Sequence, residues 1–134
     1  MTETTTTPAG PAARLLALGL LVAATAHVPG TGHHLAEAPY MGVAFVGFTF
    51  ACLGLVVALT SSVSRLVVAA SALLCSAGIA TYALTRAVAL PGLAHDVGDW
   101  LDPAGIVALA AEAVVVAASF SLLSSRGAPR AATA

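Results

Sequence analysis

Residues 41–60 read MGVAFVGFTFACLGLVVALT, a run in which Cys52 is the only ionisable side chain. At a rise of 1.5 Å per residue, about 20 residues of α-helix cross a hydrocarbon core about 30 Å thick. A membrane-spanning strand would need only about 10 residues, with apolar and polar side chains in alternation, and this run does not alternate. The stretch therefore predicts a transmembrane helix.

Three further apolar stretches surround this run, at residues 12–28, 66–90 and 103–123. The first is followed by Pro29-Gly30 and the third by Pro91-Gly92, and we expect each Pro-Gly pair to end its helix. The sequence therefore predicts an all-α fold, a polytopic four-helix transmembrane bundle. We assign it residues 12–125, with disordered tails at 1–11 and 126–134, where the composition is poor in large apolar side chains.

The composition of the whole chain agrees with a membrane protein. Only 8% of its 134 residues are charged, against about 25% in a typical soluble domain. The net charge is −1, with five arginines and no lysine, which excludes a soluble nucleic-acid-binding protein. The expected partner of the helices is the lipid bilayer.

The charged residues separate by side if the chain crosses the membrane four times. Four of the five arginines fall on one side: Arg14, Arg65, Arg126 and Arg130. Four of the six acids fall on the other: Glu37, Asp96, Asp99 and Asp102. The positive-inside rule then predicts a multi-pass protein of the cell (plasma) membrane with both termini cytoplasmic, N-in and C-in. The loops 29–40 and 91–102 would face outward.

The first stretch allows another interpretation. Arg14, the apolar run and the triplet Ala24-Thr25-Ala26 together also match a signal peptide with a small-residue cleavage site. Cleavage after Ala26 would leave three helices.

The two outward loops resemble each other. Pro29-Gly30, His33 and Glu37 have the same spacing as Pro91-Gly92, His95 and Asp99. We interpret this as two related helical hairpins that arose by duplication. The alternative is chance recurrence in a chain rich in small residues.

These loops carry a candidate metal site. If residues 32–38 are helical, His33 and His34 share a face with Glu37, and the pair His95 and Asp99 repeats the i, i+4 spacing. Imidazole and carboxylate together suit a divalent transition metal such as Zn, Cu or Fe. We therefore hypothesise a metal site whose candidate ligands are His33, His34, Glu37, His95 and Asp99. The alternative is a solvated polar loop.

Two charged residues fall within or near the membrane. Glu112 is nine residues past Pro103, roughly 13 Å below the outer boundary, and Arg86 is nearer that boundary. Because buried ionisable groups need partners, we expect Arg86 to point toward Glu112, with His27 and Tyr82 as further hydrogen-bond partners. This group is interpreted either as a buried ion pair that fixes helix packing or as a proton- or ion-handling site. Cys52 and Cys75, near mid-membrane, are interpreted as packing residues.

Several runs resemble a small actinobacterial family of four-helix integral membrane proteins. They are HLAEAPYMG at 34–42, TRAVALPG at 85–92, HDVGDW at 95–100, PAG at 103–105 and the pair Glu112-Ala113. The resemblance covers the chain from the first to the fourth helix and implies that topology. It names no activity, because the family has none established. Where such proteins often have two adjacent acids after the Leu-Pro, this chain has His95-Asp96.

The leading hypothesis for function is a small integral membrane protein that binds a cation or transition metal at its extracytoplasmic face. A second is a structural or accessory subunit of a larger membrane complex. A third is a proton-coupled transporter, built as a homo-oligomer, that uses Glu112. The sequence contains no nucleophile elbow, P-loop, CxxC or HExxH motif, so nothing in it argues for an enzyme.

Overall fold

The computed structural model describes residues 10–125 and places four long α-helices there. They are α1 (Pro11–Glu37), α2 (Pro39–Ser61), α3 (Arg65–Ala87) and α4 (Pro103–Ser125), with a short 3-10 helix, η1 (Ala94–Asp96), between α3 and α4. Each of the four α-helices is long and apolar enough to cross a membrane. No strand occurs within the described residues. The predicted all-α four-helix bundle is therefore confirmed, whereas the predicted tails fall almost entirely outside the described residues.

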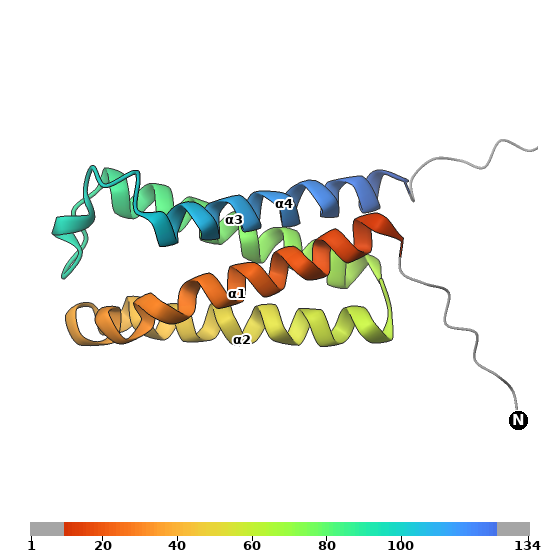
Figure 1. Cartoon of the computed structure of the whole chain (residues 1–134), viewed down its shortest axis with the longest axis horizontal. Helices are drawn as coiled ribbons and strands as arrows, with labels where there is room; N and C mark the ends of the chain where they lie inside the picture. The colour runs from red at the N-terminus through yellow and green to blue at the C-terminus, as the bar shows by residue number, and fades with distance from the viewer. Residues whose placement is uncertain (1–9, 126–134) are drawn as a thin grey trace, which may run out of the picture.

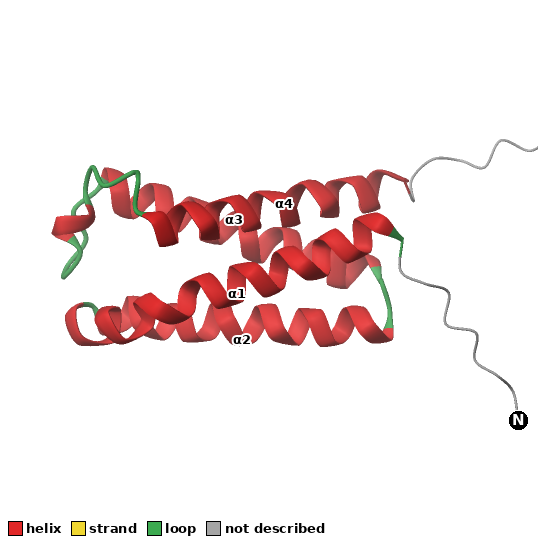
Figure 2. Cartoon of the chain, in the orientation of Figure 1, coloured by secondary structure: helices red, strands yellow, loops and turns green. Residues whose placement is uncertain are grey.

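The helices run antiparallel to their neighbours along one common axis (Figure 1). The closest packing joins α1 with α2, α1 with α4, and α3 with α4, whereas α2 and α3 touch less. Figure 2 shows that the longest loop, residues 88–102, lies at the same end as the α1–α2 junction. We call this the loop end. The opposite end, where α1 and α3 begin, carries Arg14 and Arg65, and we call it the arginine end.

The core of the bundle runs between α1 and α4. Leu16 and Leu20 of α1 and Val115 of α4 are fully buried. A Cβ at Gly19 would lie 2.7 Å from the Val115 side chain, so a glycine there lets the two helices approach closely. Large apolar side chains such as Leu73 cover the outside, which is consistent with a lipid bilayer around the bundle.

The expected end of the first helix at Pro29-Gly30 is wrong, because α1 continues to Glu37. A proline inside a helix removes one backbone hydrogen bond and costs about 3 kcal/mol. The second half of α1 offsets this cost by packing on α2. A Cβ at Gly30 would lie 3.3 Å from the Phe45 ring, and a Cβ at Gly42 would collide with Leu35.

The third helix is shorter than expected and ends at Ala87 rather than at residue 90. Val88 has extended backbone angles, and Pro91 disfavours the helical conformation of the residue before it. The early end of α3 lengthens the loop 88–102, which then folds back over the bundle. The α1–α2 junction is the single residue Ala38, so the connections of the two hairpins differ. Their predicted relationship by duplication stays a prediction.

Candidate metal centre

The loop 88–102 docks on the end of the bundle through one buried side chain. Leu93 is fully buried and packs with Ala38 and Met41 at the start of α2, and Leu90 and Phe45 border this small core. Apolar burial therefore holds the loop against the α1–α2 junction.

Backbone contacts fix the position of the loop more closely. Gly92 has a φ of 78°, and a Cβ there would collide with the carbonyl oxygen of Glu37, the last residue of α1. The Tyr40 hydroxyl donates a hydrogen bond of 2.8 Å to the Pro91 carbonyl. The loop thus lies directly over the end of α1, and η1 carries His95 beside it.

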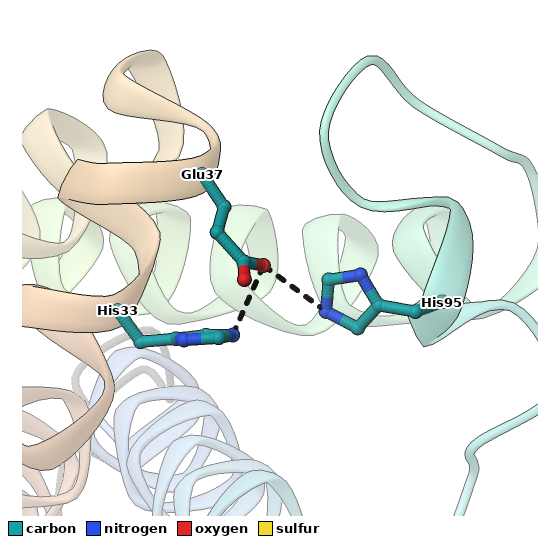
Figure 3. A group of neighbouring side chains, drawn as sticks. All are labelled: His33, Glu37 and His95. Carbon is teal, nitrogen blue, oxygen red and sulfur yellow. Dashed lines mark ion pairs between the residues drawn. The ribbon is translucent and has the colours of Figure 1, made fainter.

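Three side chains meet where the loop covers α1 (Figure 3). His33 Nε2 lies 3.1 Å from Glu37 Oε2, one turn further along α1, which confirms the predicted shared face. His95 Nε2 lies 3.6 Å from the same carboxylate oxygen. The ligand atoms of all three residues lie within 4.8 Å of one another. The end of α1 and the loop 88–102 therefore converge.

The spacing of these atoms suits a small divalent ion. Zinc binds imidazole nitrogen and carboxylate oxygen at about 2.0–2.2 Å, and in a tetrahedral arrangement such bonds set neighbouring ligand atoms about 3.4 Å apart. The two separations from Glu37 Oε2, 3.1 Å and 3.6 Å, bracket this value, and all three ligand atoms lie within 4.8 Å of one another. The side chains are about half exposed, so an ion can reach them from water.

A fourth group, which the sequence analysis did not propose as a ligand, lies beside them. Asp96 Oδ1 is 3.5 Å from His95 Nε2, and Asp96 Oδ2 is 3.1 Å from Arg86 Nη1. Arg86 therefore holds one carboxylate oxygen while the other faces the imidazole. The only sign in the sequence that Asp96 belongs near the metal site was its position next to His95. No motif indicated that Arg86 would contact Asp96.

The other two predicted ligands have different surroundings. The ring of His34 packs edge-on against Phe45, with centroids 4.7 Å apart, and its Nδ1 is buried without a hydrogen-bond partner among the described residues. The turn that carries His95 is a 3-10 helix that ends at Asp96, so His95 and Asp99 do not share a helical face. Gly98, with a φ of 84°, turns the chain before Asp99. The three-residue group includes neither His34 nor Asp99.

The expected pair between Arg86 and Glu112 does not form among the residues that the structure describes. Arg86 is 8% exposed, and its guanidinium faces Asp96 and, at 3.9 Å, Asp102. It also lies 4.7 Å above the centre of the Tyr82 ring. The loop brings Asp96 and Asp102 over the end of α3, so the long Arg86 side chain keeps its charge at the loop end of the bundle.

Glu112 has another partner, in the interior. It is 2% exposed, and its Oε1 lies 3.8 Å from His27 Nε2. The polar residues thus form two groups: an exposed one at the loop end, with Arg86 beneath it, and a buried one between α1 and α4.

Comparison with protein-family models, with curated proteins and with solved structures gave no match. The resemblance to the actinobacterial membrane protein family therefore stays a prediction.

Proposed function

We propose that this chain is a multi-pass membrane protein that binds a divalent transition-metal ion at its extracytoplasmic face through His33, Glu37 and His95. The observation that carries the proposal is the meeting of these three side chains from two separate segments, α1 and the loop 88–102. Solvated loop residues have no need to converge, whereas a metal site requires it.

The choice of ion follows from the donors. Two imidazoles and one carboxylate provide nitrogen and oxygen, which favour a borderline divalent ion such as Zn²⁺ or Fe²⁺. Cu⁺ prefers thiolate and thioether ligands, and the group contains neither. Asp96 lies outside the three-residue group, but its Oδ1 is 3.5 Å from His95 Nε2, where it adds negative charge beside the ion.

The proposed orientation puts the loop end outside the cell and both termini in the cytoplasm. Its support is the separation of charge along the bundle. Arg14 and Arg65 lie at one end, and the acids of the loop 88–102 lie at the other. The metal site would then face the extracytoplasmic side of the plasma membrane.

The test is a titration of the purified full-length protein with Zn²⁺ by calorimetry, after treatment with a chelator. We expect about one ion per chain, with loss of more than about 100-fold in affinity in His33→Ala and in His95→Ala. This is more than the 10–100-fold that is typically lost when a residue hydrogen-bonded to a metal ligand is replaced. Asp96→Asn should weaken binding by about 10-fold or more.

Matched controls exist next to each of these residues. His34→Ala removes the neighbouring imidazole, and Asp99→Asn removes a nearby carboxylate, yet both residues lie outside the three-residue group. Both variants should bind Zn²⁺ as the wild type does. If the wild type binds no ion, or if the control variants lose as much affinity as His33→Ala, the proposal is wrong.

A further inference from the structure

We propose that Glu112 and His27 form a second site, inside the bundle, which binds a single exchangeable proton between a carboxyl group and an imidazole. The site is separate from the metal centre and does not depend on it. Glu112 comes from α4 and His27 from α1, and their closest polar atoms are 3.8 Å apart.

The hydrogen bonding of His27 decides which atom faces Glu112. Its Nδ1 lies 2.8 Å from the carbonyl oxygen of Ala23, which accepts but cannot donate. Nδ1 therefore carries a hydrogen, and Nε2 is the nitrogen free to take or release a proton. Nε2 is also the atom nearest to Glu112 Oε1.

The protein closes around both groups. A Cβ at Gly78 of α3 would collide with the Glu112 carboxyl, so this glycine makes the space that the carboxyl occupies. The His27 ring stacks on Phe48, with centroids 4.4 Å apart, and meets the edge of Phe45 at 4.8 Å. Glu112 is thus enclosed by α1 and α3 in the bundle and does not face lipid.

The other titratable groups near the pair carry no fixed positive charge. Cys75 of α3 interacts electrostatically with Glu112 and with Cys52 of α2, and both thiols are fully buried. Arg86 of α3 is committed to Asp96 and Asp102 at the loop end. Among the described residues, the charge of Glu112 can therefore be balanced only by a proton held within the pair.

The number of protons follows from the cost of burying charge. With no proton the pair has a net charge of −1, and with two it has a net charge of +1, and each state costs several kcal/mol inside a membrane protein. With one proton it is neutral. At 3.8 Å the two groups are too far apart for a strong hydrogen bond, so the proton resides on Glu112 beside a neutral imidazole. Removal of this proton at alkaline pH is the kind of step that proton-coupled membrane proteins use.

The experiment uses dicyclohexylcarbodiimide, an apolar reagent that adds to protonated carboxyl groups. The carboxyl proton moves to a carbodiimide nitrogen, the carboxyl oxygen bonds to the central carbon, and the adduct rearranges to a stable N-acylurea with no leaving group. The full-length protein is treated in phosphatidylcholine vesicles over a range of pH, and the modified residue is located by peptide mass spectrometry. We expect labelling of Glu112 at neutral pH that declines at alkaline pH, none in Glu112→Gln, and none at the exposed Glu37.

The role of His27 is tested by His27→Phe, which retains an aromatic ring between Phe45 and Phe48. The neutral imidazole turns its unprotonated Nε2 toward Glu112, so it favours the protonated carboxyl over the carboxylate. Without the imidazole, labelling should therefore decline at a lower pH than in the wild type. An unchanged pH profile in this variant would remove His27 from the site.

Infrared spectroscopy supplies a measurement that does not depend on reagent access. The stretching band of a protonated carboxyl should be present in the wild type at neutral pH and absent in Glu112→Gln. If the band is absent from the wild type and Glu112 is unlabelled at acid and neutral pH, Glu112 is ionised and the inference is overturned.

Discussion

Gly92 is the residue on which the position of His95 depends most. Its positive φ disfavours any side chain by about 1–2 kcal/mol, and a Cβ would also collide with the Glu37 carbonyl. We expect Gly92→Ala to move the loop 88–102 away from α1 and to lower Zn²⁺ affinity by more than about 10-fold. Calorimetric titration measures the loss.

Gly98 provides the matched control for this prediction. It has a similar φ of 84°, but nothing lies within 4 Å of a Cβ placed there. Gly98→Ala should therefore carry the same conformational cost while retaining metal affinity. Equal losses in the two variants would show that the collision with Glu37 has no role.

Gly78 leaves space for the Glu112 carboxyl of the buried His27–Glu112 pair, as Gly92 leaves space for the Glu37 carbonyl. Gly78→Ala places a methyl group against the Glu112 carboxyl, and overpacking of this kind costs about 1–3 kcal/mol. Gly54→Ala is the control, because it is also in a helix but has open space around it, and it should be neutral or slightly stabilising. Thermal unfolding in detergent distinguishes them, and Glu112→Ala should relieve the effect of Gly78→Ala. Additive effects in that double variant would contradict the contact.

At the scale of elements, the helices could be predicted and the loop could not. A membrane demands about 20 consecutive apolar residues, so residues 41–60 indicate a helix without reference to the rest of the chain. The prediction that the first helix ends at Pro29-Gly30 was wrong, because the rule that a Pro-Gly pair ends a helix takes no account of how Gly30 packs on Phe45 in α2. Local spacing does predict that His33 and Glu37 meet, since both are on one helix.

The partners of Arg86 and Glu112 are set by contacts between distant segments. The sequence places both residues at membrane depth, which suggests that they pair. The early end of α3 instead lets the loop 88–102 bring Asp96 and Asp102 to Arg86, and the close approach of α1 and α4 brings His27 to Glu112. Membrane depth alone placed His27 in the expected group with Glu112. No spacing along the chain encodes the pairing of Arg86 with the acids of the loop.

The docking of the loop as an element can be tested at Leu93. Truncating a fully buried leucine costs about 2–5 kcal/mol, and here the loss should fall on the loop while the four helices stay intact. We expect Leu93→Ala to increase hydrogen exchange in residues 88–102 and to weaken Zn²⁺ binding. Leu101→Ala, at a side chain that is 79% exposed in the same loop, should do neither. Unchanged exchange in Leu93→Ala would mean that other contacts hold the loop.

At the scale of the whole molecule, the proposed orientation can be tested with single cysteines. Cys52 and Cys75 are fully buried, so the wild type should give little background with a membrane-impermeant maleimide. Val97→Cys at the loop end should label in intact cells, whereas Ser62→Cys at the arginine end should label only after the membrane is opened. The reverse pattern would place the metal site in the cytoplasm.

In the proposed site, two histidines and a carboxylate from separate segments bind a metal ion at the loop end. The most direct test is X-ray absorption spectroscopy of the Zn²⁺-loaded full-length protein. The ion should have only nitrogen and oxygen neighbours, at about 2.0–2.2 Å, with imidazole scattering that is lost in the His33→Ala/His95→Ala double variant. A sulfur shell at about 2.3 Å, which would place the ion at Cys52 and Cys75, or an imidazole signal that survives in the double variant, would contradict it.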